Sequence, residues 1–178
     1  MANIDLKSAQ APLKARYRED PAAAMITLYA KGNIGDGVTC SVETGQALIR
    51  AGLHPATGGG FSNVCSGDLL LQALVACAGV TLNAVATSLG LSVRDARVSA
   101  EGDLDFRGTL AVSKDVPVGF QRIRLLFAVD GALTEAELAT LIRLTERYCV
   151  VLQTLRSAAA IEVSSHLGIL GSTTAAEQ

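Results

Sequence analysis

The sequence predicts a single α+β domain, and three observations lead to that fold class. Segments in which apolar and polar residues alternate fall into two groups, and a long helical pattern follows each group. Strands and helices do not alternate one by one, as they would in a sheet built from βαβ units. The 178 residues are 49% hydrophobic and 18% charged, enough apolar chain for one buried core. We place this domain at residues 25–170, after an extension at 1–24 and before a flexible tail at 171–178.

The first half of the chain is expected to hold three short strands. We expect a helix within the extension, which lacks the continuous apolar run of a signal peptide, and we therefore expect the protein in the cytoplasm. Short apolar segments at 25–30, 38–42 and 47–53 read as strands separated by glycines.

The longest uncharged stretch, residues 69–93, is the central helix of the predicted core. Ser66 is its expected N-cap, Asp68 an acid in its first turn, and Gly90 its stop. A membrane span is the alternative reading, but polar residues are spread along the segment and no Trp or Tyr flanks it. We therefore expect a helix that is buried on most sides within a protein that does not enter a membrane.

The second half repeats the order of strands followed by a helix. Alternation predicts strands at 98–106 and 123–129, and a final strand is possible by pattern at 161–165. The motif Thr134-x-x-Glu137 is typical of a capping box, so a helix is expected from there to about residue 159.

Charge and motif spacing exclude several classes of function. A net charge of −2 offers no basic surface for nucleic acid. Cys40, His54, Cys65 and Cys77 lack the short spacings with which zinc ligands pair, so no metal site is expected. The glycines at 58–60 are followed by no Lys-Ser/Thr pair and read as a flexible bend, which leaves no cofactor site predicted.

One segment of the sequence resembles a motif of a known family. The run from Asp68 to Cys77, DLLLQALVAC, follows Gly58-Gly59 and precedes a second cysteine, Cys149, in a later helical segment. This phrase is similar to the helix signature of the OsmC/Ohr family, and the resemblance extends over residues 25–165. It implies an OsmC-like fold of two small antiparallel sheets around two central helices, with two chains intertwined as a homodimer and the active site near their interface.

The resemblance also implies a chemistry. Family members reduce organic hydroperoxides with thiols, so Cys77 would be the peroxidatic cysteine and Cys149 the cysteine that closes a disulfide with it. A dithiol reductant, of which lipoyl groups are the type known for the family, would then restore both thiols. Asp68 stands one place after the acidic position of the hydroperoxide-resistance branch and is a candidate catalytic carboxylate.

The chain departs from that branch at several positions. Gly67 occupies the place of the functional Glu, Val150 replaces the Pro after the second cysteine, and the loop at 31–37 has no arginine. A thiolate needs a positive neighbour or helix N-terminus to lower its pKa, and Lys31 and Arg50 are candidates by residue type alone.

These departures keep two further functions open. The chain could be a non-catalytic OsmC-like module that binds a small apolar ligand in the dimer cleft, with Cys77 as a packing residue. It could also be a thiol-dependent transferase or sensor. Retention of both cysteines favours the peroxidase, and loss of the arginine, the Glu and the Cys-Pro step favours the binding module.

Overall fold

A computed structural model describes residues 6–35, 39–42, 51–59, 64–163 and 165 of the chain. The N-terminal half contains α1 (Leu6–Glu19), η1 (Pro21–Ala24), β1 (Met25–Gly35), β2 (Thr39–Val42), β3 (Ala51–Gly52), η2 (Pro55–Thr57), β4 (Val64–Cys65) and α2 (Ser66–Ser88). The C-terminal half contains β5 (Val93–Asp105), α3 (Phe106–Thr109), β6 (Arg122–Gly131), α4 (Glu135–Tyr148) and α5 (Val150–Arg156). The fold class is α+β, as predicted, and the tail at 171–178 lies outside the described residues.

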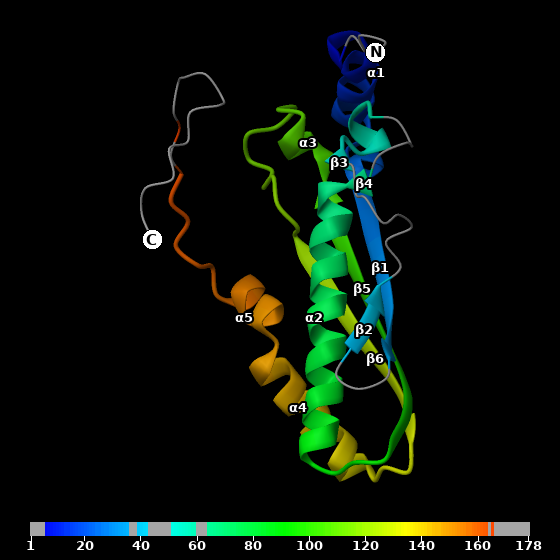
Figure 1. Cartoon of the computed structure of the whole chain (residues 1–178). Coiled ribbons are helices and arrows are strands. Elements are labelled where there is room, and N and C mark those ends of the chain that lie inside the picture. The colour runs from blue at the N-terminus through cyan, green and yellow to red at the C-terminus, as the bar shows by residue number, and fades with distance from the viewer. Residues whose placement is uncertain (1–5, 36–38, 43–50, 60–63, 164, 166–178) are drawn as a thin grey trace, which may run out of the picture.

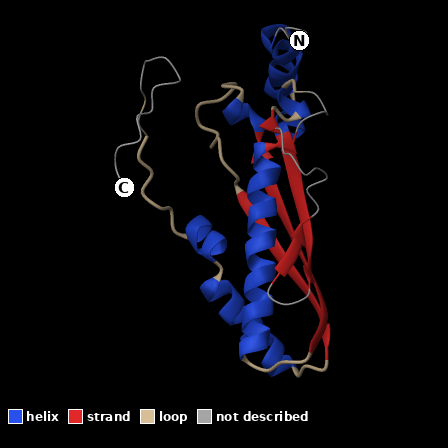
Figure 2. Cartoon of the chain, viewed as in Figure 1, coloured by secondary structure: helices blue, strands red, loops and turns tan. Residues whose placement is uncertain are grey.

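The main sheet is antiparallel and has the order β2-β1-β5-β6. Long strands form its centre, where Ile26 pairs with Leu104 and Val98 pairs with Phe127. Helix α2 runs along this sheet, and α4 and α5 lie beside α2 (Figures 1 and 2). The second sheet is a parallel pair of two-residue strands, β3 and β4, which differs from the second antiparallel sheet expected.

The core forms where α2 faces β5. Buried residues of α2 recur at helical spacing, and buried residues of β5 alternate with half-buried or exposed ones. Leu71, Leu74 and Val75 are fully buried, and each such side chain contributes about 1.5–3 kcal/mol by leaving water. This packing buries one side of α2, the one described helix that is long and apolar enough by composition to cross a membrane. Only 39% of its most apolar window is buried in this chain, less than the burial on most sides that the sequence predicted.

Both ends of α2 follow from local chemistry. Cys65, not Ser66, is the N-cap residue, and Ser66 is the first residue of the helix. At the other end Gly90 adopts a left-handed φ of 66°, and the N–H groups of Gly90 and Leu91 donate to the carbonyls of Thr87 and Ala86. These two bonds are a Schellman motif, which is the helix stop predicted at Gly90.

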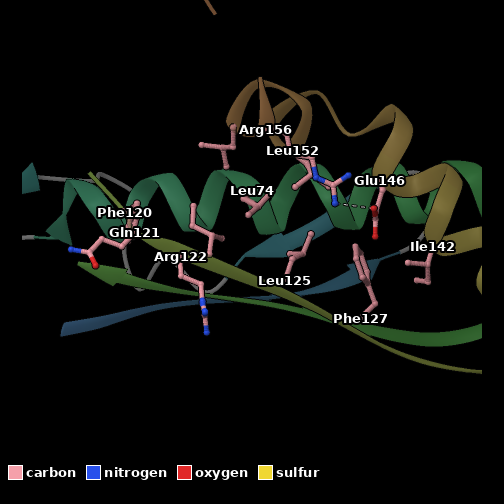
Figure 3. Close-up of a pocket in the computed structure, with 12 residues that line it drawn as sticks. Leu74, Phe120, Gln121, Arg122, Leu125, Phe127, Ile142, Glu146, Leu152 and Arg156 are labelled. Carbon is pink, nitrogen blue, oxygen red and sulfur yellow. Dashed lines mark hydrogen bonds and ion pairs between the residues drawn. The ribbon is translucent and has the colours of Figure 1, made fainter. Parts of the chain in front are cut away.

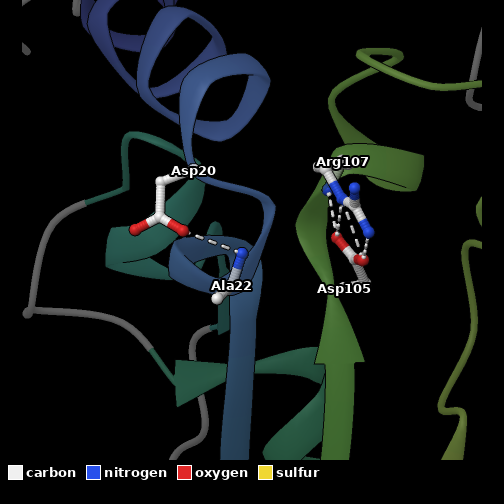
Figure 4. A network of polar contacts seen from close by, with 4 residues as sticks. All are labelled: Asp20, Ala22, Asp105 and Arg107. Atoms are coloured by element: carbon white, nitrogen blue, oxygen red, sulfur yellow. Dashed lines mark hydrogen bonds and ion pairs between the residues drawn. The ribbon is translucent and has the colours of Figure 1, made fainter.

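Asp105 ends β5 one residue earlier than predicted. Its carboxylate accepts the backbone N–H of Arg107 at 3.0 Å and pairs with the guanidinium of the same residue, so that Phe106 begins α3 (Figure 4). Asp20 accepts the N–H of Ala22 at 3.1 Å in the same way at the start of η1 (Figure 4). Short-range carboxylate caps thus fix both turns at this end of the sheet.

The predicted helix at 134–159 is two helices. Thr134 and Glu137 form the expected capping box, but the helix stops at Tyr148 and resumes at Val150. Cys149, with φ −71° and ψ 105°, is extended, so the prediction that it lies inside a helix is wrong. Residues 161–163 and 165 form no strand, because their exposed chain pairs with no described strand; residue 164 is outside the description.

Candidate active site

The two cysteines predicted to work together do meet in the structure. Cys77 lies in the middle of α2, and Cys149 lies at the break between α4 and α5, where it is fully buried. Cys77 packs against the buried cluster that contains Cys149, the two thiols interact with each other, and neither is in a disulfide. The fold therefore brings together two sulfurs that are far apart in the sequence.

Four donors surround the sulfur of Cys77. Burial is the largest single effect and opposes its ionisation, but hydrogen bonds from the N–H of Val151, the thiol of Cys149, the hydroxyl of Thr81 and the N–H of Val150 outweigh it. The pKa of Cys77 is therefore lowered from its usual value. The single hydroxyl hydrogen of Thr81 also points to the carbonyl oxygen of Cys77, at 2.7 Å, and is shared between that oxygen and the sulfur.

Cys149 has the opposite tendency. Burial raises the pKa of Cys149 to about 11, and a negative charge on Cys77 raises it further, against the lowering effect of the neighbouring N–H groups of Leu152 and Val151. Cys149 therefore stays protonated and donates its hydrogen to Cys77. The pair is asymmetric, with the thiolate favoured on Cys77.

No cation contributes to the lowered pKa of Cys77 within the part of the chain that is described. Arg50 and the side chain of Lys31 lie outside that part, so neither prediction is tested. The donors are instead the backbone N–H groups of Val150 and Val151, which our sequence analysis missed. Two β-branched residues directly after Cys149 are only a weak sign of a helix break.

Asp68 lies elsewhere on α2. It is in the first turn, about 13.5 Å along the helix axis from Cys77 at 1.5 Å per residue, and the charged group that acts on it is His54. Burial raises the pKa of Asp68 and lowers that of His54, and each partner partly offsets the shift of the other. A catalytic role of Asp68 stays a prediction.

His54 belongs to a small cavity at this end of α2. Its ring stacks on Phe106 at 5.2 Å, and its Nδ1 accepts the N–H of Ala56 at 3.1 Å. The cavity, about 240 Å³, is also lined by Cys65. No three potential metal ligands gather among the described residues, and Cys40, one of the four rejected zinc candidates, has a side chain outside them.

A larger cavity of about 430 Å³ lies among α2, β6, α4 and α5 (Figure 3). Its wall combines apolar side chains, among them Leu74 and Leu152, with polar and charged groups. Leu74 lies one turn before Cys77, and Leu152 follows Val151, a donor to the Cys77 sulfur. An ion pair between Glu146 and Arg156 lies at the rim (Figure 3). A cavity partly lined by apolar side chains thus adjoins the turns that carry the cysteine pair.

Two solved structures of other proteins have a fold similar to that of this chain. The structure is similar to a crystal structure of an OsmC-like hydroperoxide resistance protein from Jannaschia sp. CCS1, with a TM-score of 0.61 at 16% identity, covering 82% of this chain and 95% of the other. It is also similar to an OsmC-like protein from Mycoplasma pneumoniae, with a TM-score of 0.54 at 16% identity over 75% and 86% of the two chains. No curated protein sequence matches the chain.

The two structural matches, at 16% identity, show the fold alone. The family is assigned by a match to a family model. The model described as OsmC-like protein matches residues 58–164, which is more than half of the chain and includes both Cys77 and Cys149. The resemblance read from the Asp68–Cys77 phrase is confirmed, and this chain belongs to the OsmC-like protein family.

Proposed function

We propose that this chain is a thiol peroxidase that reduces organic hydroperoxides through a dithiol–disulfide cycle of Cys77 and Cys149. The observation that carries the proposal is the contact between the two thiols, together with the opposite directions of their pKa shifts. Membership of the OsmC-like family, and the name of the hydroperoxide resistance protein with a similar fold, support a role towards peroxides.

The cycle has three steps. The Cys77 thiolate attacks the terminal oxygen of R–O–OH, the O–O bond breaks, and the alkoxide takes a proton and leaves as ROH, so that Cys77 becomes a sulfenic acid. Cys149 then attacks that sulfur, an S–S bond forms, and the hydroxyl leaves with the thiol proton as water. A dithiol reductant, lipoyl-linked in our proposal, reduces the disulfide and is itself oxidised to a disulfide.

The Cys77 environment suits the first step. A mid-helix thiol gains nothing from the dipole of its own helix, and the N–H groups of Val150 and Val151 supply the stabilisation that the family branch obtains from arginine. Asp68 is too far along α2 to contact Cys77 directly, so we propose for it a role at the other end of the site, through His54.

We further propose that the active form is a cytoplasmic homodimer. Large apolar side chains are exposed on this chain: Leu126 is 65% exposed, Val150 71%, Ile161 85% and Val163 90%. Exposed apolar surface of this kind is typical of an interface between subunits. Light scattering that gave a monomer at micromolar concentration would contradict this assembly.

The second candidate function is binding of a small apolar ligand without catalysis. The cavity of about 430 Å³ beside Leu74 and Leu152 favours it, since ligand sites are typically concave and combine apolar side chains with a few polar groups. In that case Cys77 would be a packing residue, and its thiol would survive peroxide.

One experiment separates the two functions. One equivalent of cumene hydroperoxide should convert two free thiols of the wild type into one Cys77–Cys149 disulfide, identified by peptide mass spectrometry. Cys77→Ser should abolish turnover, and Cys149→Ser should leave a sulfenic acid on Cys77 that dimedone traps. The matched control is the double variant Cys40→Ser/Cys65→Ser, which should keep turnover. Survival of both thiols at neutral pH would refute the peroxidase.

A further inference from the structure

The break at Cys149 releases the first three backbone N–H groups of α5, those of Val150, Val151 and Leu152. In a continuous helix the N–H groups of Val150 and Val151 would bond to the carbonyls of Glu146 and Arg147. The bonds on either side of the break remain, from the N–H of Cys149 to Thr145 O and from the N–H of Gln153 to Cys149 O, both at 2.9 Å. The N–H groups of Val150 and Val151 act on the sulfur of Cys77 instead, and those of Val151 and Leu152 act on the sulfur of Cys149.

Two side chains bridge the same break. Nε2 of Gln153, on α5, donates to the carbonyl oxygen of Glu146, on α4, at 2.7 Å, and so satisfies the acceptor that Val150 has left. The guanidinium of Arg156 pairs with the carboxylate of Glu146 at 2.9 Å, also across the break (Figure 3). The backbone and the side chain of Glu146 therefore both tie α5 to the last turn of α4.

We propose that Gln153 and the Glu146–Arg156 ion pair are positioning groups that hold the N–H groups of Val150 and Val151 against the sulfur of Cys77. This inference rests on the proposed function in taking Cys77 as the reacting thiol. These side chains touch neither sulfur, so they act through the orientation of α5. We call them the α5 clip.

A bridge of this kind is needed because one extended residue leaves α5 free to turn. Cys149 is the only residue between the two helices, and a change in its ψ would swing α5 and carry both N–H groups away from Cys77. The ion pair alone would hold α5 weakly, since the Arg156 and Glu146 side chains are 53% and 39% exposed. The hydrogen bond from Gln153 adds a second, directional restraint.

The test measures the reactivity of the Cys77 thiol, without peroxide. The rate of alkylation of Cys77 by iodoacetamide is followed from pH 5 to pH 10 by peptide mass spectrometry in full-length wild type and in Gln153→Ala, Arg156→Ala and the double variant. We expect the double variant to lose about threefold to tenfold of the rate at pH 7 and to shift its pH profile upwards, because fewer donors stabilise the thiolate. Each single variant should lose less.

Matched controls exclude a general loss of structure. Thr154→Ala removes a hydrogen bond that lies within α5, to Val150 O at 2.9 Å, and Arg94→Ala removes the exposed ion pair to Asp130 on another face. Both should keep the wild-type pH profile. Arg156→Lys retains a cation at the clip and should recover most of the rate lost by Arg156→Ala.

The outcomes are distinct. If the double variant keeps the wild-type profile while circular dichroism shows it folded, the α5 clip is refuted. A shifted profile supports the clip even if the wild type reduces no hydroperoxide, in which case only the proposed function fails. A profile that shifts equally in Arg94→Ala would also refute the clip, because it would show an unspecific effect of lost surface charge.

Discussion

Replacing Cys149 by alanine should make Cys77 a weaker nucleophile. The thiol of Cys149 is one of four donors that together outweigh the burial of the Cys77 sulfur. A hydrogen bond to a charged acceptor contributes about 1.5–3 kcal/mol, and a thiol is a weak donor, so we take about 1 kcal/mol for this one. At a fixed pH below the pKa of Cys77, that difference corresponds to about a fivefold loss of thiolate and of alkylation rate.

The assay compares two substitutions at the same position. Cys149→Ala removes the donor, whereas Cys149→Ser keeps an O–H donor of similar size at this fully buried site. The rate of Cys77 alkylation by iodoacetamide is measured across pH by peptide mass spectrometry. Its pH profile should shift to higher pH in the alanine variant and stay near that of the wild type in the serine variant. Superimposable profiles for the wild type and Cys149→Ala would refute the view that Cys149 stabilises the thiolate. An equal loss in both variants would assign the effect to packing.

Three further predictions concern stability, each checked by urea unfolding. Stability should fall as pH rises from roughly 8.5 towards 11, because the unfolded state releases the Cys149 proton before the folded state does, and Cys149→Ala should lose less over the same range. Thr134→Ala should cost about 1 kcal/mol, since it removes the capping box of α4; no change would show that the cap is not needed. Gly102→Ala should cost about 1–3 kcal/mol because its Cβ would lie 2.4 Å from Phe120, while Gly119→Ala, with open space around it, is the control and should be milder.

Features that depend on near neighbours were predictable from the sequence. The capping box at Thr134 and the stop at Gly90 each involve hydrogen bonds over three to five residues, and both are present in the structure. The pairing of Cys77 with Cys149 came from the family resemblance, because neither cysteine identifies a partner by its own spacing.

Features that depend on distant partners were not predictable. The expected strand at 25–30 continues to Gly35 because β5 and β2 pair with the extra residues, which overrides the glycines expected to end it. The N–H groups freed at the break at Cys149 act on the sulfur of Cys77, which lies far away in the sequence. The proximity of Asp68 to His54 likewise needed the folded chain, since the residues between them give no periodic signal.

The position of Cys149 at a one-residue joint has a mechanical consequence for any reaction that joins the two sulfurs. Cys77 lies in a helix of 23 residues, and residues on either side of it in that helix are buried. Its backbone is therefore held in place by the core. Cys149 precedes a helix of only seven residues, none of which is fully buried, and it is the single residue that joins this helix to α4. Forming or breaking a disulfide would therefore move α5, which is held by the α5 clip and by its contacts with α2, more than it would move the sheet or α2.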